Sequence, residues 1–149
     1  MPATIARVQG KIPIENSYTS GIAGDKTLRA LKERGEFIGT TCEACRMTYF
    51  PARMFCERCL CRILENETKV GPEGTLEVAS LLSVNQEGKK TKPYYVGLIK
   101  FDGAGTRILH HVKIHKGQNL TSGRRVRPLL KAPDKRVGSI TDIIAFELI

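Results

Sequence analysis

Apolar residues in the second half of the chain often recur at every second position, which is the spacing of β-strands that bury one face. Two such segments, 94–101 and 107–114, flank the turn sequence DGAG at 102–105, a combination typical of a hairpin. The other predicted strands cover residues 76–84, 124–130 and 139–149. Five short strands without a long helix predict a small closed barrel, for which the five-stranded OB-fold is the most frequent topology. A different small barrel or a sandwich is the alternative.

A short helix is predicted ahead of this region, over residues 25–35. Asp25 is expected to cap its free amides, and Gly35 is expected to end it. So short a helix is unstable alone, and its apolar side chains must pack within the chain or on a partner. The candidate contact residues are Ile22, Ala23, Leu28 and Leu31.

Four of the five cysteines form two C-x2-C pairs with ten residues between them. Each pair is typical of a zinc knuckle, a turn that points two thiolates at one ion, and two knuckles complete a tetrahedral shell of four sulfurs. The predicted ligands are Cys42, Cys45, Cys56 and Cys59. Because this shell leaves no position for water, the expected role of the zinc is structural. Iron in the same cage and a disulfide framework are alternatives, and Cys61 is interpreted as a spare thiol.

These patterns predict a mainly β fold in three parts. An N-terminal arm and helix occupy residues 1–39, a rubredoxin-like zinc ribbon residues 40–70, and an OB-fold barrel residues 71–149. The turn sequence GPEG at 71–74 marks the last boundary.

Composition and hydropathy predict the kind of environment in which the chain folds. Hydrophobic residues make up 41% of the 149 positions, so the chain can bury a core. No run reaches the roughly 18 apolar residues of a membrane span, and the N-terminus MPATIARVQG does not resemble a signal peptide. The chain is therefore expected to be soluble and cytoplasmic, with no membrane partner.

Positive charge is concentrated in the C-terminal half. The net charge of the chain is +9, and residues 86–136 hold thirteen of its 24 Lys and Arg residues but three of its 15 acids. A concentrated positive field attracts anions, so this segment predicts an anionic partner. Solubility alone is the alternative.

The ribbon sequence at 37–59, FIGTTCEACRMTYFPARMFCERC, contains an aromatic-Pro-x-Arg step at Phe50, Pro51 and Arg53. With this step, it resembles the acyl-CoA-associated zinc-ribbon/OB-fold family, the domain of unknown function 35 type. The order of helix, ribbon and basic strand-rich half extends the resemblance over nearly the whole chain. Members of that family accompany thiolase-like enzymes as small non-catalytic subunits. Their ribbon and helix grip the enzyme, and their barrel helps to frame the CoA site.

The resemblance implies a thiolase-like catalytic partner, such as an aroylsuccinyl-CoA or acetoacetyl-CoA thiolase, with a CoA thioester at a shared site. Under this hypothesis, cations of the basic half are expected near the CoA phosphates or the partner surface. The candidates are Arg124, Arg125, Arg127 and Lys131. Ordinary surface solvation is the alternative for each.

No catalytic residue is predicted. His110, His111 and His115 lie on or beside a predicted strand with no nucleophile or paired acids nearby, and they are interpreted as structural. Two other functions remain open. A single-stranded nucleic-acid-binding module fits the basic charge, although aromatic residues are 6% of the chain and tryptophan is absent. An iron-binding, rubredoxin-like electron carrier fits the cysteine cage.

Overall fold

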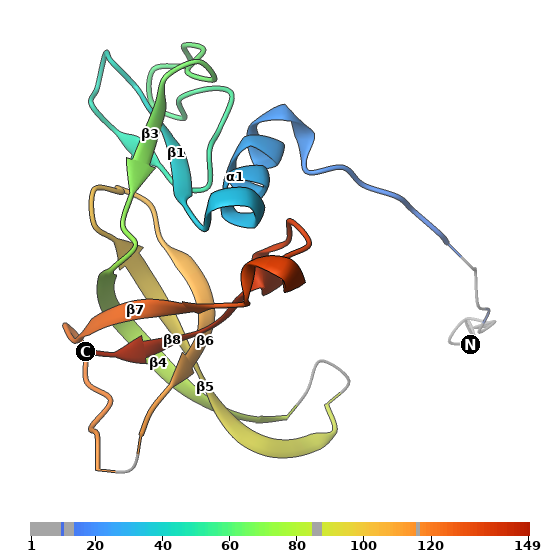
Figure 1. Cartoon of the computed structure of the whole chain (residues 1–149), viewed down its shortest axis with the longest axis vertical. Helices are drawn as coiled ribbons and strands as arrows, with labels where there is room; N and C mark the ends of the chain where they lie inside the picture. Colours follow the sequence, from blue (N-terminus) through green and yellow to red (C-terminus); the bar gives the residue numbers. More distant parts are fainter. Residues whose placement is uncertain (1–9, 11–13, 85–87, 116) are drawn as a thin grey trace, which may run out of the picture.

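The computed structural model describes residue 10 and residues 14–84, 88–115 and 117–149 (Figure 1). Glu87 and Lys116 of the basic segment and most of the predicted arm before Ile14 lie outside these residues. The elements are α1 (Gly21–Arg34), β1 (Phe37–Thr41), β2 (Thr48–Tyr49), β3 (Glu67–Val70), β4 (Gly74–Val84), β5 (Lys90–Phe101), β6 (Ile108–Lys113), β7 (Arg125–Leu130), the 3-10 turns η1 (Pro133–Lys135) and η2 (Ile140–Asp142), and β8 (Ile143–Leu148). No helix in this described part combines the length and apolarity that a bilayer span needs.

The predicted helix is confirmed, but it begins one turn earlier than expected. Its N-cap is Ser20, so the interpretation of Asp25 as the cap is wrong. Asp25 lies inside the helix, where its carboxylate pairs with Arg29 one turn later at 2.8 Å, a spacing that supports helices. Gly35 ends the helix as predicted, with φ +67° and its N–H bonded to the carbonyl of Leu31.

The helix docks within the chain. Ala23 and Leu31 are buried as expected, whereas Ile22 is 61% exposed. The buried Thr27 hydroxyl donates to the Ile38 carbonyl at 2.7 Å and accepts from the backbone N–H of Ala52 at 2.9 Å. One side chain therefore ties α1 to the first strand of the ribbon and to the loop between the two cysteine pairs.

The ribbon and the barrel are separate sheets. The ribbon is a three-stranded antiparallel sheet in the order β2-β1-β3, and the barrel is closed in the order β4-β5-β6-β8-β7. The barrel pairs are antiparallel except β6–β8, and β7 returns to β4 through Gly74 and Val126. The predicted five-stranded barrel is confirmed, and this order is compatible with the OB-fold. Figure 1 shows the ribbon and α1 at one end of the barrel and the β4–β5 hairpin reaching past the other.

The last predicted strand begins later than expected, because residues 139–142 form a turn. The Ser139 hydroxyl accepts from the N–H of Thr141 at 3.3 Å, and the Asp142 carboxylate accepts from the N–H of Ser139 at 3.2 Å. These reciprocal bonds make a capping box, which stabilises η2, and β8 therefore starts at Ile143 rather than Ser139.

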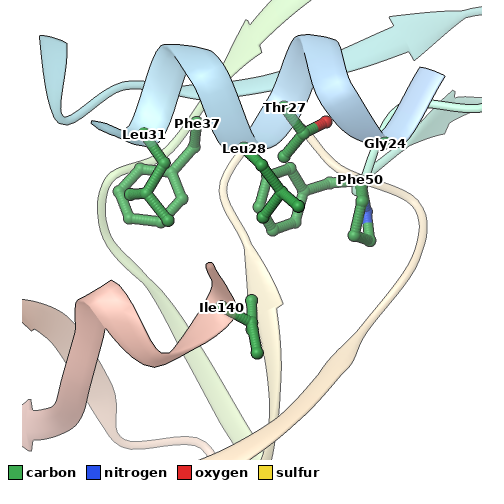
Figure 2. A pocket seen from close by; sticks show the side chains of 8 residues that line it. Gly24, Thr27, Leu28, Leu31, Phe37, Phe50 and Ile140 are labelled. Atoms are coloured by element: carbon green, nitrogen blue, oxygen red, sulfur yellow. The ribbon is translucent and has the colours of Figure 1, made fainter. Parts of the chain in front are cut away.

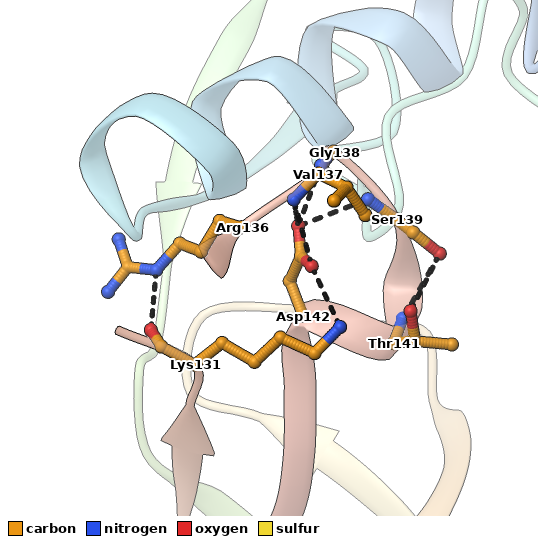
Figure 3. A network of polar contacts seen from close by, with 7 residues as sticks. All are labelled: Lys131, Arg136, Val137, Gly138, Ser139, Thr141 and Asp142. Atoms are coloured by element: carbon orange, nitrogen blue, oxygen red, sulfur yellow. Dashed lines mark hydrogen bonds and ion pairs between the residues drawn. The ribbon is translucent and has the colours of Figure 1, made fainter. Parts of the chain in front are cut away.

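The fully buried Asp142 organises the loop between β7 and β8, which packs against α1 (Figure 3). Its carboxylate accepts from the backbone N–H groups of residues 137–139 and from Lys131 Nζ at 3.3 Å. Arg136 donates from Nε to the Lys131 carbonyl at 2.9 Å, and Figure 3 shows it beside the end of α1. A buried carboxylate with this many donors is fully satisfied, so it holds the loop in one conformation.

The largest hydrophobic cluster of the described residues runs through both sheets, and two smaller clusters involve the ribbon. The Phe101 ring of the barrel lies 4.8 Å from the rings of Phe37 and Phe50 in the ribbon region and 5.6 Å from Phe146 of β8. The N–H of Phe50 also donates to the Thr106 hydroxyl at 2.7 Å. The predicted boundaries at 39/40 and 70/71 stay predictions, and apolar packing continues across both of them.

Candidate metal centre

The two cysteine pairs adopt the same turn. In each, the N–H of the residue after the second cysteine bonds to the carbonyl of the first: Arg46 to Cys42 at 2.7 Å, and Leu60 to Cys56 at 2.9 Å. Arg46 and Leu60 have φ values of +60° and +57°, a left-handed conformation that costs a non-glycine residue about 1 kcal/mol. The repeated strained turn is the backbone of a zinc knuckle, and it aims both thiols of a pair toward the same point.

The sulfurs of the four predicted ligands converge. These atoms, of Cys42, Cys45, Cys56 and Cys59, all lie within 4.8 Å of one another. Around a zinc ion with Zn–S bonds of about 2.3 Å, tetrahedral sulfurs stand about 3.8 Å apart, so a small contraction brings the group to that geometry. The set of four thiols and its spacing therefore fit a closed tetrahedral metal site.

The polar surroundings favour ionised sulfur at Cys56. The Tyr49 hydroxyl lies 3.4 Å from Cys56 Sγ, and the N–H of Cys59 donates to the same sulfur at 3.4 Å. The hydrogen bond from Tyr49 lowers the pKa of the Cys56 thiol to about 6 and raises the pKa of Tyr49 to about 12. Tyr49 is also buried in the small hydrophobic cluster of the ribbon, and this bond ties it to the sulfur.

The four thiols cannot all ionise without a cation. Hydrogen bonding to Cys45 and burial raise the pKa of the Cys59 thiol to about 12, while hydrogen bonding lowers that of Cys42. Four thiolates in contact repel one another, and a dication relieves that repulsion. The chemistry of the donor set thus requires a bound metal for the fully ionised form.

Cys61 lies next to the four sulfurs but outside the convergent group. Its Sγ is 3.5 Å from Cys42 Sγ, and its carbonyl accepts from the N–H of Cys56 at 2.9 Å. Met47 takes the same place after the first knuckle, where its carbonyl accepts from the N–H of Cys42 at 2.8 Å. The interpretation of Cys61 as a spare thiol stays a prediction.

Three of the four cations predicted to face CoA or a partner are paired with acids of this chain. Arg125 bonds to Asp102 at 2.7 Å and to Glu73 at 3.1 Å. Arg127 bonds to Glu147 at 2.6 Å, and Lys131 to Asp142 at 3.3 Å. Arg124 precedes β7 and has no ion pair in the described part of the chain. Sequence reasoning could not find these pairs, because the partners lie 11 to 52 residues away.

The three histidines do not converge on one site, although the rings of His110 and His111 lie 6.0 Å apart. His110 is half-buried, with its ring 5.6 Å from Phe146, whereas His111 points outward beside Tyr94. His115 follows the end of β6, with Nε2 3.7 Å from Glu147. The three histidines therefore lie in different surroundings, and their interpretation as structural residues stays a prediction.

An apolar pocket of about 210 Å³ lies where α1, the ribbon and η2 meet (Figure 2). Sequence analysis had proposed Leu28 and Leu31 as contact residues, and both side chains point into this pocket in Figure 2. The lining residues are Gly24, Thr27, Leu28, Leu31, Phe37, Phe50, Pro51 and Ile140.

Known proteins share the ribbon and the fold. Residues 29–65 match the family described as "ChsH2, rubredoxin-like zinc ribbon domain". A DUF35 domain-containing scaffold protein of Methanocaldococcus jannaschii is 27% identical over 107 residues, covering 71% of this chain and 75% of that protein.

Two solved structures extend the likeness to the barrel. One is a protein of unknown function from the DUF35 family of Sulfolobus solfataricus, with a TM-score of 0.63, 24% identity and coverage of 86% and 84% of the two chains. The other is the Ltp2-ChsH2(DUF35) aldolase, with a TM-score of 0.61, 16% identity and coverage of 92% and 98%. The resemblance drawn from the sequence is thereby confirmed: this chain carries a ChsH2-type zinc ribbon within the fold of the DUF35 zinc-ribbon proteins.

Proposed function

We propose that this chain is the non-catalytic, zinc-binding subunit of a cytoplasmic thiolase-type complex that processes acyl-CoA, and that it docks on the catalytic chain and helps to frame the CoA site. Two likenesses support this role. One related protein is described as a scaffold protein, and a neighbour of the same fold is described as the "Ltp2-ChsH2(DUF35) aldolase". The catalytic nucleophile then belongs to the partner.

Zinc is the proposed metal, held by Cys42, Cys45, Cys56 and Cys59. It supplies a cross-link between the two knuckles rather than a reactive water, because four protein sulfurs complete its coordination. Elemental analysis of the purified protein should return one zinc per chain and a colourless solution. Stoichiometric iron with visible absorbance would instead support the electron-carrier alternative.

The observation that carries the docking proposal is the apolar pocket between α1, the ribbon and η2. Its walls are almost entirely apolar, and Ile140 at its rim is 42% exposed. Ile22, on the first turn of α1, is 61% exposed. Apolar concave surfaces left in contact with water are typical of binding sites, and this one lies beside the zinc-supported ribbon.

Co-purification from the native cell tests the subunit role directly. A thiolase-like chain should accompany this protein, and adding the protein should restore that chain's activity on an acyl-CoA thioester. Aroylsuccinyl-CoA and acetoacetyl-CoA are the first two substrates to compare. If neither copurification nor restored activity is observed, the role is refuted.

The docking surface is tested by Ile140→Asp, which places a charge at the rim of the pocket. We expect the affinity for the catalytic chain to fall at least tenfold, about 1.4 kcal/mol, with unchanged zinc content. Val78→Asp is the control, because Val78 is likewise an exposed aliphatic residue, at 61%, but lies on β4 of the barrel. Equal losses from the two variants would contradict a surface at the pocket.

A further inference from the structure

The cations of the barrel are not equally free to bind an anionic ligand, because some of them are paired with acids of this chain. The acids that pair with Arg125, Arg127 and Lys131 neutralise much of the charge around β7. Lys92 of β5 and Lys113 of β6 are exposed and have no ion-pair partner within the described residues. Unpaired ammonium groups attract anions more strongly than paired ones, so the β5–β6 surface is the better anion site.

The strand register places these lysines on one outer face. Val96 of β5 lies opposite His111 of β6, and side chains alternate along each strand. Lys92 and Tyr94 therefore share the face of Val96, and Lys113 shares the face of His111. On this face the Tyr94 and His111 rings lie 5.0 Å apart, with 32° between their planes.

A groove of about 560 Å³ runs over β5, β6 and β8, and we call it the outer groove. Its lining includes Lys92, Tyr94, His111 and Lys113. The exposed Ile144 of β8 contributes an apolar side. The remaining lining residues are Pro93, Tyr95, Val112, Ile114 and Ala145. A paired aromatic surface, an apolar side and two free ammonium groups are thus combined in one open site.

A carboxylate lies near the outer groove. Glu147 is in register with Lys113 on the parallel strand β8. Its carboxylate accepts from Arg127 at 2.6 Å and faces His115 Nε2 at 3.7 Å. Glu147 is thus bonded to Arg127, and no ion pair joins it to Lys92 or Lys113 among the described residues.

We propose that the outer groove binds a nucleoside phosphate. The planar base stacks on the Tyr94–His111 pair, and the phosphates contact the ammonium groups of Lys92 and Lys113. Aromatic side chains stack on any base, and ammonium groups bind phosphate as point charges. This inference is independent of the subunit role, because it is tested on the free chain.

Calorimetric titration of the full chain with ADP tests the proposal. We expect a dissociation constant below about 1 mM at low salt, with adenosine and pyrophosphate each binding at least tenfold more weakly. Pyrophosphate binding as tightly as ADP would overturn the proposal, because charge alone would then explain binding. Adenosine 3′,5′-bisphosphate, which is also the nucleotide end of CoA, is a second probe. Binding of a ten-nucleotide oligo-dT without binding of either mononucleotide would overturn it in favour of single-stranded nucleic acid.

Variants distinguish ADP binding in the outer groove from attraction by the overall positive charge of the chain. The double change Lys92→Ala and Lys113→Ala should weaken ADP at least tenfold and reduce the salt dependence. Lys100→Ala with Lys135→Ala removes the same charge from positions outside the groove and should change affinity less than twofold. Tyr94→Leu should abolish the preference for ADP over pyrophosphate. Equal effects of the two lysine pairs, or an unchanged preference in Tyr94→Leu, would refute the site.

Discussion

At the scale of single residues, the five cysteines differ in environment although they share one chemistry. Cys42 and Cys56 are fully buried, Cys59 is exposed, and Cys61 touches Cys42 from outside the group of four. The C-x2-C spacing was enough to identify the four proposed ligands, because a knuckle is closed by bonds within five residues. The Tyr49 bond to Cys56 was not predictable, since it depends on how the ribbon folds over the site.

Replacing a proposed ligand should separate it from the fifth cysteine. We expect Cys56→Ser to lose stoichiometric zinc and to unfold the ribbon, because structural zinc contributes about 10 kcal/mol or more in small zinc modules. Cys61→Ser is the control and should keep one zinc per chain. Elemental analysis and thermal unfolding provide both readouts. Loss of zinc in both variants would assign Cys61 to the metal.

Asp142 predicts a defined pH dependence of stability. Burial favours its neutral form, but the amides of residues 137–139 and Lys131 outweigh burial and lower its pKa below the ordinary value near 3.8. The unfolded chain therefore takes up this proton at higher pH than the folded chain. The stabilisation is complete above that ordinary value and is lost as pH falls through the lower folded pKa.

The variant Asp142→Asn removes this contribution. It should cost about 3 kcal/mol at pH 7, because buried donors lose their charged acceptor. The difference from the wild type should shrink as pH falls below about 4. Denaturant titrations from pH 3 to pH 7 measure it. A difference that stays constant over this range would contradict the assignment.

At the scale of elements, the helix shows where local rules succeed and where they fail. Gly35 ends α1 as predicted, because a left-handed residue closes a helix whatever surrounds it. The start of α1 was predicted at the wrong residue, since a capping residue and an i,i+4 pairing residue look alike in sequence. Residues 139–142 present a similar ambiguity. They were predicted to begin the last strand, but they form a capping box and a 3-10 turn.

The C-terminus of α1 is tested by Gly35→Ala. The left-handed φ alone should cost about 1 kcal/mol, and the added Cβ would also stand 2.8 Å from Arg136 Nη1 and 3.3 Å from Leu130 Cδ1. Gly103→Ala is the control, because its φ is +81° but no atom lies within 4 Å of the new Cβ. Thermal unfolding should show the larger loss for Gly35→Ala. Equal losses would mean that Arg136 and Leu130 move aside for the new Cβ without a cost in stability.

At the scale of the whole molecule, the ribbon and the barrel share the largest hydrophobic cluster, and the ribbon has a small one of its own around Cys42 and Tyr49. Phe37, Phe50, Phe101 and Phe146 form one series of ring contacts from β1 to β8. The sequence divided the chain into three parts because spacing and turn signals change at the junctions. Nothing in those signals reports that the apolar faces on both sides pack together.

The shared core predicts cooperative unfolding. Phe101→Ala removes the central ring and should cost about 3–5 kcal/mol, which is typical of a buried Phe. Chelation of the metal should lower the stability of the barrel as well as that of the ribbon. Hydrogen exchange of barrel amides, measured with and without chelator, checks this coupling. Barrel protection that does not respond to chelation would show that the two sheets unfold separately.

What the sequence determined by itself is what short-range geometry controls: the two cysteine turns, the end of the helix, the hairpin and the alternation of five strands. These features depend on bonds and side-chain directions within a few residues. Tertiary structure alone decided which cations are neutralised and which face the outer groove. Barrel closure brings Arg125 to Asp102 and Glu73, and it leaves Lys92 and Lys113 unpaired within the described residues. Whether a cation is free to bind a ligand depends on its neighbours in space. Strand order and register set those neighbours, and distance along the chain does not.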